Sequence, residues 1–354
     1  MPAATGPANP LDAALSQESG LRADAGVGMG AASDDDAGEP ADARTHTSAA
    51  HHFELPPVTT ARIETLVAPS QLGSSERAAF LDDGRFFVLG GEGIYEIVGR
   101  PTDYSAVLVA PNPGCTFGGF SARGARLYAS CTNADTFTCE LIVYEPARKV
   151  PLVSRALIAT TGPAHFNGSA FGPDGALYVS NSLAGTDSED PAVVRLKILK
   201  EEPLQFEQTP FVAASVTGAM PDNGGGSFPN GIRFHGDTMY LARGVDVLAV
   251  PIDPSKRGPT LQVAYTADGT FPDIDDFDIA DERMWLSKFD SLRVFGLPGS
   301  SQLVVADLQG KVQLALELPF VPSHAIVSVD TLFGPACVIL TSYFDGGLYR
   351  VSFE

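Results

Sequence analysis

The sequence predicts an all-β protein: a six-bladed β-propeller over residues 53–354, preceded by a disordered N-terminal tail over residues 1–52. Glycine and proline are frequent, with 36 and 27 among the 354 residues, which is typical of many short strands joined by turns. No stretch carries apolar residues at sustained helical spacing. A strand–turn–strand pattern also recurs from about residue 60 onward, at the spacing of propeller blades.

The N-terminal tail differs in composition from the rest of the chain. It consists mostly of Ala, Gly, Pro, Asp and Ser, has almost no aromatic residues, and contains an acidic patch at Ser33–Asp36. Such a segment buries too little apolar surface to offset the entropy lost on ordering, so we expect it to be disordered. As written it lacks the basic and apolar regions of a signal peptide. Tails of this kind often tether secreted domains, so we expect an extracellular or periplasmic protein, tethered to a surface by this tail.

The stretch His165–Asn181, with the sequence HFNGSAFGPDGALYVSN, shows the repeating unit most clearly. An Asn-Gly pair opens it, and a short apolar strand follows. The turn Pro173-Asp174-Gly175 then favours a hairpin, because proline presets φ and glycine allows a positive φ. The second strand, ALYVS, is rich in residues that favour strands.

Relatives of this second strand occur along the whole chain. They are GRFFVLGG (84–91), ARLYASC (125–131), DTMYLAR (237–243), ERMWLSK (282–288) and CVILTSY (337–343). These five strands and ALYVS are each followed by a further expected strand: GIYEIV (93–98), ELIVYE (140–145), AVVRLKI (192–198), DVLAVPI (246–252), SLRVFGL (291–297) and GLYRVSF (347–353). The residues Phe87, Tyr128, Tyr178, Tyr240, Trp285 and Ile339 mark six units, spaced roughly 40 to 60 residues apart.

Six such units favour a six-bladed propeller, in which only short strand edges are exposed. The segment Ala61–Ala68 has no hairpin partner of its own, so we expect it to complete the last blade and close the ring. Two β-sandwiches of three repeats each are the alternative. The repeats run without a linker in the middle, which favours the propeller.

Charge and hydropathy exclude several classes of partner. The formal net charge of -20 argues against nucleic acid and anionic membranes, because both require a basic surface. No apolar run is long enough to insert into a membrane. We therefore expect a monomer whose partner is a small molecule.

The four cysteines form no CxxC pair, which disfavours a zinc ribbon or a thioredoxin-type site. Cys131 and Cys139 flank a predicted hairpin loop and could reach each other. A disulfide between them and two buried free thiols remain alternatives.

The residues at which the first strand of each blade begins should converge on one mouth of a central channel. Counting back ten or eleven residues from each marker gives Glu76, Phe117, Asn167, Asn230 and Asp275, and the last blade offers Ser323 and His324. Two carboxylates and two amides form the oxygen-rich set that Ca²⁺ prefers. For each Asn-Gly pair taken alone a turn is the favoured explanation, whereas the four residues taken together favour a shared ion.

The segments FNGSAFGPDGALYVSN, FPNGIRFHGDTMYLA and DDFDIADERMWLS resemble those of the gluconolactonase/regucalcin-like propellers, with paraoxonase and diisopropyl fluorophosphatase as more distant relatives. The resemblance covers roughly residues 60–354. It implies a channel Ca²⁺ held by Glu76, Asn167, Asn230 and Asp275. This chain departs from the pattern in having Glu76-Arg77-Ala78 for the usual Glu-Gly-Pro, and in placing His165 where the lactonase branch often has arginine.

The resemblance further implies a calcium-dependent hydrolase of a lactone or related ester. Asp275 would be both a metal ligand and a candidate base or nucleophile, and His165 and His324 are candidate proton carriers. Asp276 is an additional candidate ligand, whereas Asp278 is expected to accept hydrogen bonds from the backbone. The alternative is a non-catalytic, calcium-stabilised propeller that serves as a binding or surface module.

Overall fold

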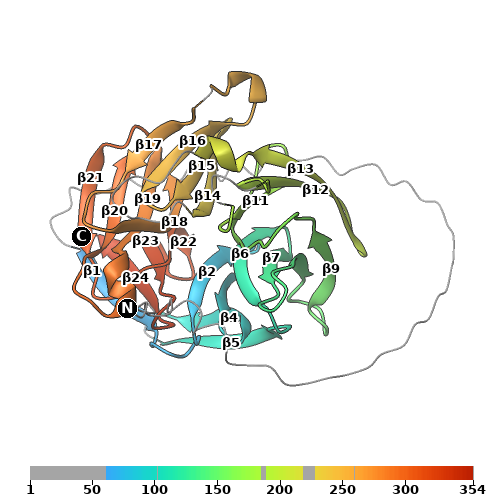
Figure 1. Ribbon diagram of the computed structural model, residues 1–354. Coiled ribbons are helices and arrows are strands. Elements are labelled where there is room, and N and C mark those ends of the chain that lie inside the picture. Colours follow the sequence, from blue (N-terminus) through green and yellow to red (C-terminus); the bar gives the residue numbers. More distant parts are fainter. Residues whose placement is uncertain (1–60, 102, 185–188, 218–227, 259, 354) are drawn as a thin grey trace, which may run out of the picture. The chain divides into compact units, whose positions relative to one another are not determined.

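The computed structural model describes residues 61–353, except residues 102, 185–188, 218–227 and 259. The predicted disordered tail lies outside these residues. The described chain forms six four-stranded antiparallel sheets (Figure 1). The first strands of successive sheets contact one another in a closed cycle. The predicted six-bladed β-propeller is therefore confirmed, and the alternative of two β-sandwiches is wrong.

Each blade runs from an inner strand near the axis of the ring to an outer strand at its rim. Blade one comprises β2 (Ser75–Phe80), β3 (Phe86–Gly90), β4 (Gly93–Arg100) and β5 (Asp103–Pro111). Blade two comprises β6 (Thr116–Arg123), β7 (Arg126–Thr132), β8 (Cys139–Tyr144) and β9 (Leu152–Ile158). Blade three comprises β10 (Phe166–Phe171), β11 (Leu177–Asn181), β12 (Val193–Glu201) and β13 (Leu204–Val212). Blade four comprises β14 (Pro229–His235), β15 (Thr238–Arg243), β16 (Asp246–Pro251) and β17 (Gln262–Thr266). Blade five comprises β18 (Pro272–Ala280), β19 (Arg283–Asp290), β20 (Ser301–Asp307) and β21 (Val312–Glu317). Blade six comprises β22 (His324–Thr331), β23 (Gly334–Thr341), β24 (Leu348–Phe353) and β1 (Ala61–Val67).

The sixth blade is built from both ends of the described chain. Strand β1 pairs antiparallel with β24, with Ala61 opposite Phe353, and supplies the outer strand of the blade. The predicted closure of the ring by this segment is confirmed.

One expected strand is wrong. The segment SLRVFGL (291–297) contains the 3-10 helix η3 (Ser291–Phe295), and the third strand of blade five is β20 instead. The Asp290 side chain accepts a hydrogen bond from Leu292 N, and Gly296 ends the helix in the left-handed conformation. These local caps override the strand propensity of the segment. Two shorter 3-10 helices, η1 (Ala214–Thr217) and η2 (Pro254–Lys256), lie in connecting loops.

The hydrophobic core consists of six clusters, one at each interface between neighbouring blades. Successive side chains of a strand point to opposite faces of its sheet. Phe86 therefore packs against blade six, whereas Phe87 packs against blade two. All six sequence markers face the next blade along the chain, which explains why large apolar residues recur at that position.

Five of the six inner strands contain a β-bulge near their start. In β10, for example, Phe166 pairs with Asn181 and Ser169 pairs with Val179, so the inner strand has one extra residue. The paired register skips the same two positions in the other four strands: 76–77, 118–119, 230–231 and 275–276. Strand β22 pairs with β23 without a bulge. We call the two skipped residues the first and second bulge positions.

Of the two alternatives left open for Cys131 and Cys139, the bridge between them is wrong and the pair of free thiols is right only for Cys139. Cys131 is bonded to Cys115, and Cys139 is a buried free thiol. In the β7–β8 hairpin, Cys139 lies opposite Thr132. Cys131 is one residue away from that pair, so its side chain points to the other face of the sheet. The two cysteines accordingly pack in different interblade clusters.

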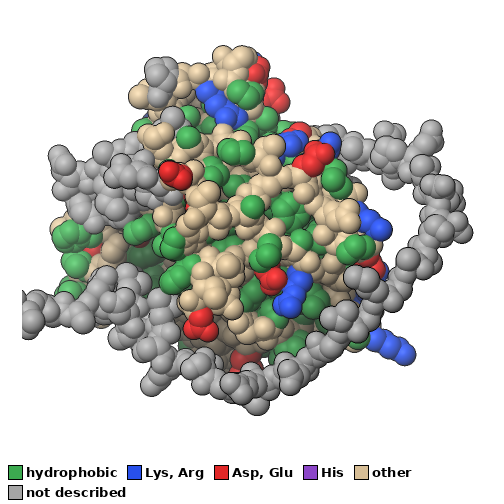
Figure 2. Space-filling view, turned by 45° about the vertical axis from the view of Figure 1, so that its right-hand side comes forward, with side chains coloured by type: hydrophobic (Ala, Val, Ile, Leu, Met, Phe, Trp, Pro, Cys, Tyr) green, Lys and Arg blue, Asp and Glu red, His purple; other side chains and the backbone are tan. Residues whose placement is uncertain are grey.

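Among the described residues, no helix has the length and hydropathy needed to cross a membrane. The face shown in Figure 2 mixes apolar, acidic and basic side chains, with no large basic patch.

Replacing Gly168 with alanine tests how closely the inner strands pack. An added Cβ at this second bulge position would lie 1.8 Å from the carbonyl oxygen of Asn230, so β10 and β14 would have to separate. We expect Gly168→Ala to lower the free energy of unfolding by about 3 kcal/mol or more, measured by denaturant unfolding. Gly162→Ala is the control, since its Cβ would meet only Asp190 Oδ2 at 3.6 Å. Equal stability of the two variants would contradict this packing.

Candidate functional site

The bulges bring the four predicted metal ligands to equivalent places. Glu76, Asn167, Asn230 and Asp275 occupy the first bulge position of β2, β10, β14 and β18, and all four are partly exposed. The counts of ten and eleven differ because of the hairpin turn. The residue paired with the marker always lies three positions after the first bulge position, whereas the marker follows its partner by eight residues in blades one and three and by seven in blades four and five. In blade two, however, the equivalent residue is Gly118. The predicted Phe117 precedes the bulge and is buried between blades one and two.

Hydroxyl groups on the second strands hold these bulges in place. Ser180 Oγ accepts a hydrogen bond from Gly168 N at 2.8 Å and donates one to Asn230 O at 2.6 Å. Thr341 Oγ1 donates to Glu76 O at 2.9 Å. Sequence analysis missed these residues, although Ser180 and Thr341 each lie two positions after a marker residue.

The guanidinium of Arg77 lies among the predicted ligands. It extends from the second bulge position of blade one, and the residue is 1% exposed. Its Nη2 donates to Asn167 Oδ1 at 3.1 Å and to Asn230 Oδ1 at 2.5 Å, and its Nη1 pairs with Asp276. One side chain thus connects four blades. From the sequence, Arg77 is recognised only as a departure from the family pattern, and its place in the site was not predicted.

Each amide also contacts a carboxylate. Asn230 Nδ2 donates to Asp275 Oδ1 at 2.5 Å, and Glu76 accepts a hydrogen bond from the Asn167 side chain. Asp275 accepts a further bond from Ser323. The structure therefore brings all four predicted ligands into one hydrogen-bonded group. We call these four residues and Arg77 the axial cluster.

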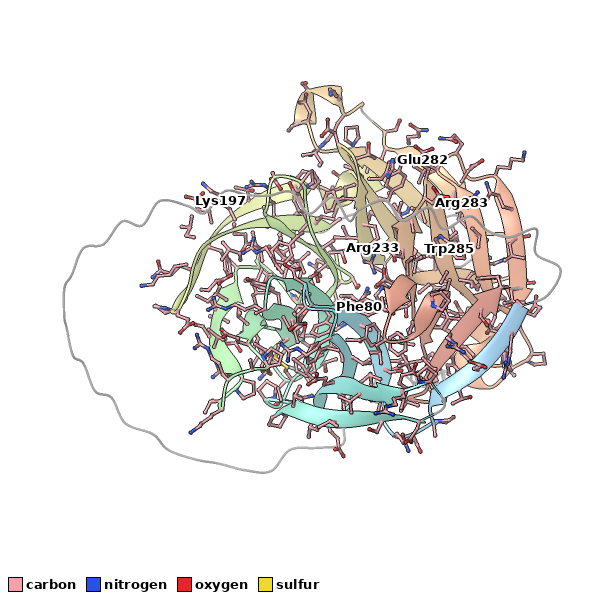
Figure 3. The ribbon with its side chains drawn as sticks, turned by 180° about the vertical axis from the view of Figure 1, so that it is seen from behind. Phe80, Lys197, Arg233, Glu282, Arg283 and Trp285 are labelled. Atoms are coloured by element: carbon pink, nitrogen blue, oxygen red, sulfur yellow. A yellow bond between two sulfur atoms is a disulfide. The ribbon has the colours of Figure 1, made fainter. Side chains whose placement is uncertain are left out.

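Asp276 anchors the second guanidinium of the site. It pairs with Arg77 and with Arg233, whose Nη2 lies 3.3 Å from Asp276 Oδ2. Figure 3 shows Arg233 projecting from β14 toward the interior of the ring. Burial opposes ionisation, but the charges of Arg233 and Arg77 hold the pKa of Asp276 below its usual value. Asp278 accepts hydrogen bonds from Ile279 N and Val327 N, as its predicted backbone role requires.

Negative charge is in excess around the axial cluster. Five carboxylates, those of Glu76, Asp273, Asp275, Asp276 and Asp278, lie in this region with two guanidinium groups, those of Arg77 and Arg233. Burial raises the pKa of Glu76 to about 8, with a smaller contribution from Asp275 and Asp276. Burial also raises the pKa of Asp275 to about 6, and Asp276 adds to this shift. Burial thus disfavours the ionised form of both acids, and the charge of Arg77 opposes both pKa shifts.

This donor set has the chemistry of a hard-cation site. Carboxylate and amide oxygens are the ligands that Ca²⁺ prefers, and the excess negative charge suits a divalent ion. Within the described part of the chain, no group of three His, Cys, Asp or Glu side chains is arranged to hold a metal. An ion at this place therefore depends on the two amide oxygens, and both of them now face Arg77.

The two predicted histidines have different surroundings. His324 is buried, its Nδ1 accepts a hydrogen bond from Ala78 N at 3.2 Å, and its Nε2 contacts Arg233 and lies 3.4 Å from Asp276 Oδ2. Burial lowers its pKa to about 3, although Asp276 opposes the shift. His165 is partly exposed, and its Nδ1 lies 3.1 Å from Thr132 Oγ1. Burial and the charge of Arg77 lower its pKa to about 4.

Tyr343, in the loop between β23 and β24, adds an aromatic side chain near these groups. It is 44% exposed and stands edge-on to Phe344. Burial of its phenol, together with the charges of Glu76 and Asp275, raises the pKa of Tyr343. Tyr343 was not predicted from the sequence, because it lies after the marker of its blade, whereas the predicted site residues all lie before their markers.

Asp276→Asn tests whether this carboxylate balances the two guanidinium groups. The substitution leaves both arginines without a charged partner at this position, so we expect about 3–5 kcal/mol less stability in denaturant unfolding. Asp83→Asn makes the same change in an exposed pair with Arg85 and should cost less than about 1 kcal/mol. Similar small losses in both variants would show that Asp276 does not have this role.

No protein-family model matches the sequence, and no curated protein matches it significantly. Solved structures do resemble the fold. A gluconolactonase from Xanthomonas campestris is 16% identical, with a TM-score of 0.54 over 84% of this chain and 91% of its own. The PQQ-bound aldose sugar dehydrogenase from Streptomyces coelicolor is 15% identical, with a TM-score of 0.51 over 84% of this chain and 100% of its own.

A protein from Thermus thermophilus described as a glucose dehydrogenase-type oxidoreductase is also 15% identical, with a TM-score of 0.50 over 83% of this chain and 100% of its own. At these identities the likeness concerns the fold alone. Enzymes with different named activities therefore share the architecture of this chain, and its function must be argued from its own residues.

Proposed function

We propose that the protein is a calcium-dependent hydrolase of a lactone or related ester, with Ca²⁺ held by Glu76, Asn167, Asn230 and Asp275. The observation that carries this proposal is the shared position of these side chains. They come from four blades, occupy the same bulge position and touch one another or the same guanidinium. The excess of carboxylates over guanidinium groups around them also supports a divalent ion.

A Ca²⁺ bound there would polarise the carbonyl oxygen of an ester. The residues around it would supply the proton transfer, and His165 is the best placed candidate base. Its Nδ1 contacts Thr132 Oγ1, which lies 3.2 Å from Cys139 Sγ, and Cys139 Sγ donates to Ala164 O at 3.1 Å. Because the carbonyl can only accept, this chain of donors assigns a proton to Nδ1 and leaves the lone pair on Nε2.

The proposed reaction is an ordinary hydrolysis. The oxygen of a water molecule bonds to the carbonyl carbon, and His165 Nε2 takes one of its protons. The bond from that carbon to the alkoxy oxygen breaks, and the departing alkoxide receives the proton from His165. An ester yields a carboxylic acid and an alcohol, and a lactone yields a hydroxy acid.

We assign different roles to the other two predicted catalytic residues. Asp275 is a metal ligand, and its carboxylate is oriented by Asn230 and Ser323. His324 is a positioning residue, because both of its ring nitrogens face protein groups. Its Nδ1 accepts a hydrogen bond from Ala78 N in β2, and its Nε2 lies beside the carboxylate of Asp276.

The named activities of the similar structures are compatible with this proposal but do not choose among substrates. The Xanthomonas campestris protein is a gluconolactonase, whereas the other two are described as sugar oxidoreductases. His165 stands where lactonase relatives often have arginine. We therefore propose a lactone or ester without specifying a sugar.

Chelation and ligand substitution test the metal. We expect the protein to hydrolyse lactones or aryl esters with Ca²⁺ and to lose this activity in a chelator. Asp275→Asn and Asn230→Ala should each lower kcat/KM by at least about 100-fold. The exposed Asp103→Asn is the control and should match wild type. Activity that survives chelation and both substitutions would refute the proposal. Bound calcium without turnover would favour the stabilised, non-catalytic module.

His165→Gln tests the base. Loss of proton transfer should lower kcat by about 100-fold or more, while calcium binding and the melting temperature stay close to wild type. His235→Gln makes the same change at an exposed position at the far end of β14 and should leave kcat unchanged. A His165→Gln enzyme as active as the control would exclude His165 as the base.

A further inference from the structure

We propose that the guanidinium of Arg77 competes with the divalent ion for the side-chain oxygens of Asn167 and Asn230. Arg77 would then act as a cation that the protein itself supplies to the axial cluster. This inference rests on the proposed metal site. It goes beyond that site by assigning a regulatory effect on metal affinity to a residue that is not a ligand. Three features of the structure lead to it.

The first feature is the position of Arg77. The second bulge position is glycine in blades two, three and four: Gly119, Gly168 and Gly231. Alanine at Gly231 would place a Cβ 2.0 Å from Asp276 Oδ1, so even one carbon does not fit there. Blade one instead carries the long, charged Arg77, and blade five carries Asp276, its ion-pair partner. Among the five bulges, Arg77 is the one cation.

The second feature is the set of atoms that Arg77 contacts. Its Nη2 is within hydrogen-bond distance of both Asn167 Oδ1 and Asn230 Oδ1. These two oxygens are the amide donors of the proposed metal site. In this arrangement each amide turns its nitrogen toward a carboxylate, Asn167 toward Glu76 and Asn230 toward Asp275. The guanidinium therefore satisfies the oxygens that a hard cation would use.

The third feature is the burial of the guanidinium. A divalent ion bound to the same oxygens would lie a few ångströms from a positive charge that is shielded from water, and like charges repel strongly in such surroundings. Binding of the ion must therefore move Arg77 or turn both amides. Either change breaks the hydrogen bonds between Arg77 and the two amides, which weakens the apparent metal affinity.

Arg233 offers a matched comparison. It is also a guanidinium, and it also contacts Asp276, but within the described part of the chain its hydrogen bonds and ion pairs involve neither Asn167 nor Asn230. If the nearby positive charge alone opposed the metal, removing either arginine would help binding. If occupation of the amide oxygens is what matters, only removal of Arg77 will help.

The experiment is calorimetric titration of the metal-free, full-length protein with CaCl₂. Wild type is compared with Arg77→Met and Arg233→Met, and circular dichroism confirms that each is folded. We expect Arg77→Met to bind Ca²⁺ at least about tenfold more tightly than wild type, and Arg233→Met to stay within about threefold of it. Arg77→Gln, which keeps a hydrogen-bond donor without the charge, replaces Arg77→Met if that variant does not fold.

The outcomes separate this inference from the proposed function. Wild-type binding that Arg77→Met does not tighten, or an equal gain in Arg233→Met, overturns the competition and leaves the proposed metal site intact. Binding by Arg77→Met without binding by wild type supports the competition and overturns the calcium-dependent function. No binding by either protein overturns both.

Discussion

The inner strands approach one another so closely near the axis that backbone and side chains compete for the same space. A Cβ at Gly168 would fall 1.8 Å from a carbonyl oxygen of the neighbouring blade, and one at Gly231 would strike Asp276. The bulges resolve this crowding by adding one residue to each of five strands and placing glycine at the tightest positions of three. Side chains at the first bulge positions can then converge, so the axial cluster depends on the bulges.

The repeat in the sequence predicts the blades because each marker residue has the same physical task. Tyr178 and Trp285, for example, both fill the interface to the following blade. The same regularity allowed Ala61–Ala68 to be predicted as the closing strand. The convergence of the four oxygen-bearing residues was also predicted, because the shared bulge places each of them three residues before the strand partner of its marker.

The failures have three physical causes: the register of a hairpin, local helix caps, and contacts between segments far apart in the sequence. The pairing of Cys131 depends on which face of β7 it occupies, and the hairpin register decides that. The caps at Asp290 and Gly296 turn an apolar stretch into η3. Arg77 extends from blade one to partners 90 to 199 positions away, and nothing near it in the sequence indicates that reach.

Closure of the ring by β1 has a consequence for how the chain is made. Arg350 pairs with Glu64 across this seam, 286 positions away in the sequence. Contacts over such a separation form slowly, because the entropy of closing the loop must be overcome first. Phe86 of blade one and Ile339 of blade six share the core cluster at the interface between these two blades. During synthesis, the apolar face of blade one therefore stays uncovered until the final blade has left the ribosome.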